Sequence, residues 1–145
     1  LLAGGLSHGE DLLAAQALGA DLAYLGTRFI NTFESQADEA YRNMIIEAVS
    51  GEIIHTPAVS GVPASFMRQS LEVAGFPMEE LNQAGEINVG EKVKPIDDEA
   101  KAWKTVWSAG QGVSQIHDVL SVSELVSRLT EEYRNARERL LSTGS

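Results

Sequence analysis

The chain has 145 residues, of which 43% are hydrophobic and 22% charged, and it has no cysteine. These proportions are typical of a folded globular domain, and the lack of cysteine excludes disulfides and thiolate metal sites. The formal net charge of −10 argues against nucleic acid and anionic membranes as partners, because both would repel the chain. A phosphate ligand remains compatible with this charge, since backbone N–H groups bind phosphate without a net positive charge.

The chain opens with a pattern typical of a strand followed by a helix. An apolar start is interrupted by Gly4 and Gly5. Ser7 and Glu10 then have the spacing of a capping box, which predicts a helix that begins at about His8. An apolar strand end at the first residue also leads us to expect that this chain is the C-terminal piece of a longer protein.

The first helix is followed by the pattern of a second strand. Gly19 suits the position just after a helix, where a left-handed backbone is common. Residues 21–25 then form a short apolar run that ends at Gly26. Because a helix precedes this run, it is expected to be a buried strand parallel to the first one.

Several elements are expected between this unit and the end of the chain. They are a helix from Thr32 or Ser35 to Val49, an extended segment at 52–56, a helix at 64–75, a surface loop at 82–95 and a helix at 97–108.

The last helix has the clearest pattern. Ser121 and Glu124 form a second capping box, and Glu124 is spaced to pair with Arg128 one turn later. Apolar residues follow at helical spacing at Leu125, Leu129, Tyr133, Ala136 and Leu140.

The glycines at the two strand ends are candidates for binding a phosphate. Gly4 and Gly5 can adopt positive φ and let an anion approach the main chain closely. Gly26 and Thr27 would offer further donors at the next strand end. An α/β barrel binds phosphate at its last two strands in this way. The residues alone leave open the alternative that these glycines form an ordinary turn and strand end.

Several segments resemble the nitronate monooxygenase family, formerly called 2-nitropropane dioxygenases. The resemblance rests on Ala3-Gly-Gly-Leu6, on residues 19–32 (GADLAYLGTRFINT), on Glu34-Ser35, on 41–48 and on 107–112 (WSAGQG). It extends over nearly all of the chain. It implies an α/β fold, namely the C-terminal part of a (β/α)8 TIM barrel with its last βαβ unit, followed by a mainly helical C-terminal region.

The resemblance also implies a cofactor, an activity and three regions. FMN would be the cofactor, and the enzyme would oxidise alkyl nitronates with O₂. Residues 1–50 would end the FMN-binding barrel, 51–100 would form a helical and loop insertion or cap, and 101–145 would be C-terminal helices that pack on the barrel. The FMN phosphate would be bound by Gly4, Gly5, Gly26 and Thr27, with Ala3 and Leu25 flanking them. The family's catalytic histidine lies upstream, so no catalytic residue is assigned here.

Other side chains allow two readings each. Arg28 is expected either to assist an anion or to pair with a carboxylate such as Glu34. His8 is expected to be a solvated loop residue rather than a phosphate contact. Trp103 and Trp107 are expected in the core rather than over a flavin. No histidine and carboxylate set has the spacing of metal ligands, so no metal site is predicted.

The expected partners are a small-molecule substrate such as a nitronate and the remainder of the same barrel, with a homodimer as one assembly open to the protein. Gln111, between two glycines, is a hypothetical contact to cofactor or substrate. A cytoplasmic location is expected. Two rival functions stay open: a flavin-dependent enoyl-thioester reductase, whose sequences resemble this family, and a non-catalytic fragment or interaction module that binds no flavin.

Overall fold

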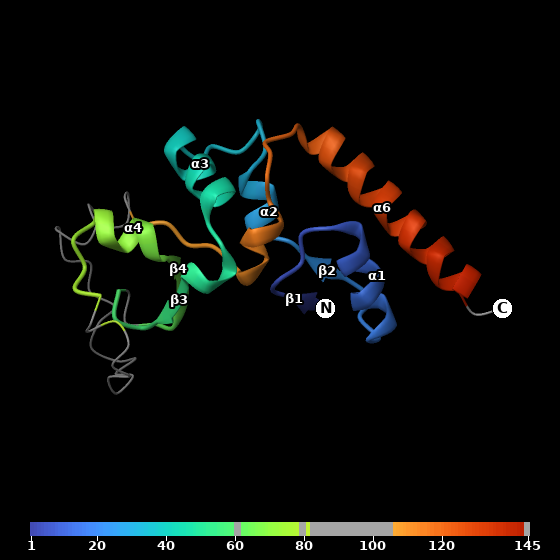
Figure 1. Ribbon diagram of the computed structural model, residues 1–145, viewed down its shortest axis with the longest axis horizontal. Helices are drawn as coiled ribbons and strands as arrows, with labels where there is room; N and C mark the ends of the chain where they lie inside the picture. Colours follow the sequence, from blue (N-terminus) through green and yellow to red (C-terminus); the bar gives the residue numbers. More distant parts are fainter. Residues whose placement is uncertain (60–61, 79–80, 82–105, 144–145) are drawn as a thin grey trace. The chain divides into compact units, whose positions relative to one another are not determined.

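A computed structural model describes residues 1–59, 62–78, 81 and 106–143 (Figure 1). The chain divides into two compact units. The first contains Leu1–Glu47 together with Gln111–Ser145, and the second contains Ala48–Gly110. The beginning and the end of the chain therefore belong to the same unit.

The first unit opens with a strand, a helix and a strand. Strands β1 (Leu2–Ala3) and β2 (Ala23–Tyr24) pair in parallel, with Leu2 opposite Ala23 and Ala3 opposite Tyr24. Helix α1 (Gly9–Ala17) connects them. The order of elements and the parallel pairing expected from the sequence are thus confirmed. The expected burial of the second strand is wrong, because both residues of β2 are exposed on this chain.

The C-terminal end of α1 is a Schellman motif. Gly19 has φ +87°, and its N–H donates to the carbonyl oxygen of Gln16 at 2.9 Å. The N–H of Ala20 donates to the carbonyl oxygen of Ala15 at 3.0 Å. Both bonds satisfy carbonyl groups that the helix leaves without partners, so the expected end at Gly19 is confirmed.

The N-terminal cap of α1 differs from the expected box of Ser7 and Glu10, which is wrong. Asp11 accepts hydrogen bonds from the backbone N–H of Ser7 at 2.7 Å and of His8 at 2.8 Å. The hydroxyl of Ser7 instead donates to the carbonyl oxygen of Gly112 at 2.9 Å. A distant partner takes the hydroxyl, and the cap moves one residue along the chain.

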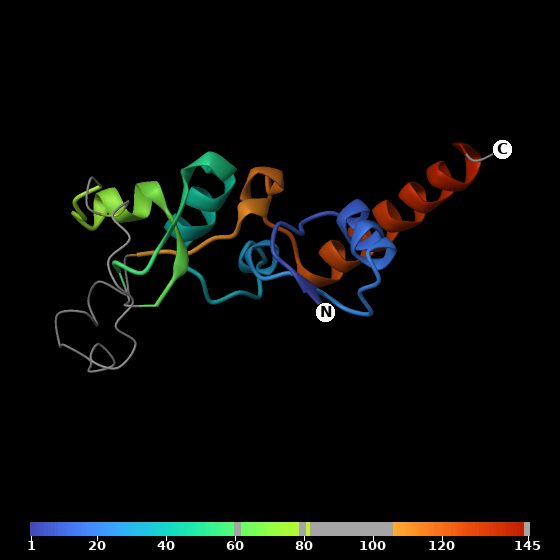
Figure 2. The ribbon, with the colours of Figure 1, turned by 90° about the horizontal axis from the view of Figure 1, so that it is seen from below.

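Helix α6 (Val122–Thr143) packs along α1, as Figures 1 and 2 show from two directions. Its predicted capping box is confirmed. The N–H of Ser121 donates to Glu124 Oε2 at 2.9 Å, and the N–H of Glu124 donates to Ser121 Oγ at 3.2 Å. The two reciprocal bonds satisfy donors at the start of the helix.

The apolar stripe of α6 is confirmed over most of its length. Leu125, Leu129 and Ala136 are buried, and Tyr133 is half-buried. Leu140 is 63% exposed, so the buried part of the stripe ends one turn earlier than expected.

Two helices follow β2 in the first unit, namely α2 (Thr27–Ile30) and α3 (Glu39–Glu47). The expected start of α3 at Thr32 or Ser35 is wrong. Thr32 Oγ1 donates to the carbonyl oxygen of Phe29 at 2.9 Å, and Ser35 Oγ accepts from the N–H of Ala37 at 3.2 Å. Both side chains thus stabilise the turns before the helix.

The second unit is built on a hairpin of β3 (Ile53–Thr56) and β4 (Ala64–Met67), preceded by the 3₁₀ helix η1 (Ser50–Glu52) and followed by α4 (Arg68–Val73). The strands are antiparallel, with Ile53 opposite Met67. The extended segment expected at 52–56 is confirmed over Ile53–Thr56, while Glu52 ends η1. The helix expected at 64–75 is wrong in its first part, because pairing with β3 makes 64–67 a strand and buries Phe66 and Met67.

The end predicted for the helix at 97–108 is wrong. Residues 106–108 are not helical: the carbonyl oxygen of Trp107 accepts from the N–H of Met67 at 3.0 Å, and Ser108 forms an isolated antiparallel bridge with Phe66. Trp107 is half-buried. The predicted loop at 82–95, the residues 97–105 and Trp103 lie outside the described residues. Within the part of the chain that is described, no helix combines the length and apolar character needed to span a bilayer.

Replacing Gly9 tests the packing of α1 against α6. A Cβ at Gly9 would lie 2.3 Å from the backbone nitrogen of Tyr133 and 2.4 Å from the carbonyl oxygen of Leu129. Because both atoms belong to the backbone of α6, the helices must separate. We expect Gly9→Ala to lower the free energy of unfolding by about 1–3 kcal/mol, measured by urea denaturation followed by circular dichroism.

Gly51→Ala is the matched control, because a Cβ at Gly51 would meet no atom within 4 Å. It should change the free energy of unfolding by less than about 0.5 kcal/mol. Equal stabilities of the two variants would contradict the close approach of α1 and α6.

Candidate functional site

Strands β1 and β2 end at the same edge of their sheet. Ala3 and Tyr24 are the last pair of the ladder. Neighbouring strands lie about 4.8 Å apart. One strand then enters the loop at Gly4 and Gly5, and the other enters α2 at Thr27. The sequence-predicted cradle residues therefore leave the sheet on adjacent strands.

Gly4 and Gly5 both have the left-handed backbone expected of them. Their φ angles are +97° and +71°, a region in which side chains are strained. A Cβ at either position would meet no atom within 4 Å. Glycine is therefore required here by the backbone conformation and not by crowding, and the space beside both residues is open.

Gly26 has a different environment. Its φ is −92°, and a Cβ there would approach only Cε1 of Tyr24, at 3.8 Å. Its carbonyl oxygen accepts from the N–H of Phe29 at 3.0 Å and of Ile30 at 3.3 Å, which closes the single turn of α2. The backbone does not demand glycine at this position, so a small residue is needed only if something else approaches closely.

Gly112 contacts the loop that follows β1, and sequence reasoning missed this role. It belongs to the 3₁₀ helix η2 (Gln111–Gln115). A Cβ at Gly112 would lie 2.6 Å from Ser7 Oγ and 3.0 Å from the carbonyl carbon of Gly5. The only sequence signal was its membership of the 107–112 segment in the family resemblance, because a glycine demanded by close approach leaves no local pattern.

Arg28, the residue after Thr27, is buried with 3% of its side chain exposed. Its Nη2 lies 2.7 Å from Asp118 Oδ1, and its Nη1 donates to the carbonyl oxygen of Asp118 at 3.3 Å. The expected alternative of pairing with a carboxylate is confirmed, but the carboxylate is Asp118 and not Glu34, which accepts from the N–H of Val122 at 3.0 Å. The other alternative, in which Arg28 assists an anion, is not supported, because its guanidinium is bonded to Asp118.

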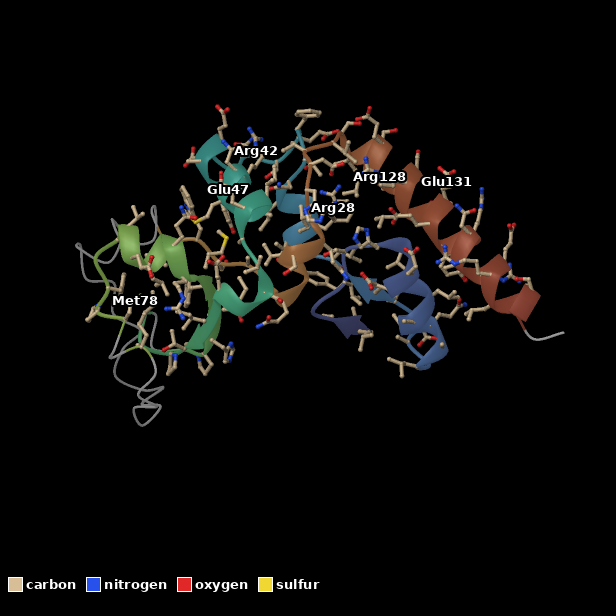
Figure 3. The ribbon with its side chains drawn as sticks, viewed as in Figure 1. Arg28, Arg42, Glu47, Met78, Arg128 and Glu131 are labelled. Carbon is tan, nitrogen blue, oxygen red and sulfur yellow. The ribbon has the colours of Figure 1, made fainter. Side chains whose placement is uncertain are left out.

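Asp118 also binds Arg128, whose Nη1 lies 2.5 Å from Asp118 Oδ2. Figure 3 labels both arginines, Arg28 on α2 and Arg128 on α6. Arg128 therefore bonds to Asp118, although its spacing on α6 predicted Glu124 as the partner. The carboxylate of Asp118 joins two helices that are far apart in sequence.

The pKa of Asp118 lies below its usual value. Partial burial is the largest single influence and raises the pKa, but the hydrogen bonds and charges of Arg128 and Arg28 together outweigh it. Asp118 is therefore ionised at neutral pH. Its contribution to stability is present above the pKa of the unfolded chain and is lost as the pH falls through the lower folded-state pKa.

His8 lies beside a carboxylate rather than an anion site. Its Nδ1 is 3.7 Å from Glu132 Oε1, and Glu132 Oε2 accepts from the N–H of Gly9 at 2.8 Å. His8 and Glu132 line a small cleft of about 70 Å³ together with Arg28 and Asp118. His8 is thus partly exposed, and its neighbour is a carboxylate of α6.

Two further sequence candidates are Gln111 and Trp107. Gln111 is exposed at the start of η2, and Trp107 belongs to the second unit. Across the described residues, no three histidine, aspartate or glutamate side chains gather in a way that could hold a metal ion.

Comparison with known proteins relates this geometry to a family. The family model for nitronate monooxygenase matches residues 1–132. A nitronate monooxygenase of Paraburkholderia phytofirmans is 31% identical over 145 residues, which cover 97% of this chain and 39% of that protein. The chain thus spans about two fifths of the length of this relative.

Two solved structures share the fold. Nitroalkane oxidase from Streptomyces ansochromogenes is 30% identical with a TM-score of 0.71, covering 95% of this chain and 40% of the other. FabK from Thermotoga maritima is 27% identical with a TM-score of 0.70, covering 97% of this chain and 46% of the other. These neighbours are TIM barrels, so the expected fold class, the C-terminal part of a (β/α)8 barrel, is confirmed. With the family model matching most of its residues, the chain belongs to the nitronate monooxygenase family.

Proposed function

We propose that the protein is an FMN-dependent oxidoreductase that oxidises alkyl nitronates with O₂, and that this chain supplies the site for the FMN phosphate. The proposal rests on one observation above all. Two neighbouring parallel strands end in open, glycine-containing turns. Membership of the nitronate monooxygenase family supports the choice of substrate.

The phosphate would lie between the two turns. Gly4 and Gly5 would present backbone N–H groups on one side, and Gly26 and Thr27 would do so on the other, with Ala3 and Leu25 flanking them. Each hydrogen bond to a charged acceptor contributes roughly 1.5–3 kcal/mol. Backbone donors suit this protein, because its net charge of −10 provides no general attraction for an anion.

This chain holds and orients the cofactor, and FMN when bound would supply the electron-accepting chemistry. The open φ-positive turn lets the phosphate reach the main chain without a Cβ in the way. No side chain of this chain is assigned to proton removal.

The remainder of the barrel is the proposed partner of the exposed face beside β2. A hollow of about 910 Å³ runs along this strand and along α1. Leu22 is 65% exposed and Tyr24 is 64% exposed beside it. Exposed apolar side chains flanking an edge strand suit the packing of further strands and helices.

The alternative is a flavin-dependent enoyl-thioester reductase. The strand-end site would serve it equally well, because the site contacts only the phosphate and does not select the reaction.

Assays of the full-length protein separate these two activities. We expect O₂ uptake that depends on an alkyl nitronate and proceeds without NAD(P)H, measured with an oxygen electrode. Oxidation of NAD(P)H that depends on an enoyl thioester would favour the alternative. A purified full-length protein without flavin absorbance, and unable to take up added FMN, would contradict both.

Replacing Gly26 tests the phosphate site. A valine there fills the open space beside the turn with a branched side chain and displaces the phosphate from the backbone. Losing one charged hydrogen bond corresponds to about a tenfold to hundredfold weaker affinity. We expect Gly26→Val to raise the Kd for FMN by this factor, measured by fluorescence quenching during titration of the apoprotein.

Gly51→Val is the control for this substitution. Gly51 also has open space around it and lies in the second unit, so its replacement should leave the Kd for FMN unchanged. Retention of FMN by Gly26→Val with wild-type affinity would refute the site.

A further inference from the structure

The segment formed by residues 111–121 contacts both of the turns that would bind the phosphate. It contains η2 and the residues that lead to α6. Its beginning lies against the loop after β1, and its end lies against α2 and the residues that follow α2. This 111–121 segment is far from both turns in sequence.

The first contact is made by Gly112. Its backbone packs so closely on the loop that a Cβ would come within 3.0 Å of the carbonyl carbon of Gly5 and 3.1 Å of the carbonyl oxygen of Gly5. Its carbonyl oxygen accepts from the buried hydroxyl of Ser7 at 2.9 Å. Any enlargement at Gly112 therefore pushes on the backbone of Gly5 itself.

The second contact is made by Asp118. Its carboxylate binds the buried guanidinium of Arg28, the second residue of α2. Its carbonyl oxygen also accepts from Arg28 at 3.3 Å and from Asn31 Nδ2 at 3.5 Å. Asn31 is fully buried and donates as well to the carbonyl oxygen of Arg42 at 3.1 Å.

Backbone bonds extend this second contact. The N–H of Phe33 donates to the carbonyl oxygen of Leu120 at 2.9 Å, and the N–H of Leu120 donates to the carbonyl oxygen of Asn31 at 3.5 Å. Thr32 and Leu120 form an isolated parallel bridge. The residues after α2 are thus tied to the end of the 111–121 segment.

Such external support is needed because the local structure is short. Helix α2 has 4 residues, and a single turn is not stable by itself. This short helix therefore cannot by itself fix the position of the Gly26 turn, and contacts from other parts of the chain are needed.

From these contacts we propose that the 111–121 segment positions the two phosphate-binding turns relative to each other. Gly112 is the positioning residue for the Gly5 turn, and Asp118 acts through Arg28 as the positioning residue for the Gly26 turn. This inference rests on the proposed function. Donors on separate turns must converge on the same oxygens, and small misplacements of such groups weaken binding strongly.

Removing the carboxylate of Asp118 tests this role through a comparison of two ligands. Riboflavin lacks the phosphate of FMN, so the ratio of the Kd for riboflavin to the Kd for FMN reports on the phosphate site alone. In the full-length protein we expect Asp118→Ala to lower this ratio about tenfold, as loss of a supporting contact does at other bound groups. The Kd for riboflavin should stay unchanged.

Three further variants sharpen the experiment. Asp118→Glu restores the carboxylate and should return the ratio of the two Kd values most of the way to the wild-type value.

Gly112→Ala leaves the Arg28–Asp118 pair intact and should also lower this ratio. It keeps the test decisive if Asp118→Ala does not fold. Glu10→Ala is the matched control, because it removes another carboxylate paired with an arginine, Arg139 at 3.1 Å, in an exposed ion pair that does not include the 111–121 segment. It should leave the ratio at the wild-type value.

The outcomes separate this inference from the function on which it rests. A wild-type protein that binds FMN no more tightly than riboflavin would remove the phosphate site itself, and the inference with it. A wild-type preference for FMN that Asp118→Ala and Gly112→Ala leave intact would overturn the positioning role while the site stands. Equal weakening of both ligands in these variants would also overturn it, because that indicates a general loss of structure.

Discussion

The buried guanidinium of Arg28 is the constraint on which much of the first unit depends. Arginine stays charged in proteins, and an unpaired charge inside a fold is costly. Asp118 meets that need with its carboxylate and its backbone carbonyl group. In doing so it places the residues that lead to α6 against α2, and Arg128 on α6 binds the same carboxylate. Two ion pairs of one carboxylate therefore join α2, which follows β2, to the last helix.

Glycines in the first unit fall into three groups by the physical reason for the missing side chain. Gly4, Gly5 and Gly19 adopt a backbone conformation that disfavours side chains. Gly9 and Gly112 lie where another backbone approaches too closely for a Cβ. Gly26 satisfies neither condition, since its φ is negative and the space around it is open. The backbone and packing of this chain therefore give no reason for glycine at position 26. A phosphate bound beside Gly26 would explain why a residue without a side chain stands there.

The net charge of this protein does not favour the binding of a phosphate at the strand ends. The chain carries a net charge of −10, and its buried arginine beside the strand ends is neutralised by Asp118. An anion at the strand ends would therefore depend on backbone N–H donors, which need precise placement rather than net charge. That dependence makes the packing behind the turns, at Ser7, Gly112 and Asp118, as relevant as the turns themselves.

Local patterns in the sequence determined the elements that depend on near neighbours. The Schellman end at Gly19, the capping box of Ser121 and the stripe of α6 were predictable, because each rests on bonds or spacings within a few residues. The parallel pairing of β1 and β2 was predictable because a helix connects the two strands. The family resemblance, carried by short motifs, indicated the barrel fold. Tertiary structure alone decided the partner of Ser7, the strand at 64–67, and the pairing of Arg28 with Asp118. In each case a residue distant in sequence offered a better hydrogen bond or a deeper burial than the local alternative, and no local pattern records such a partner.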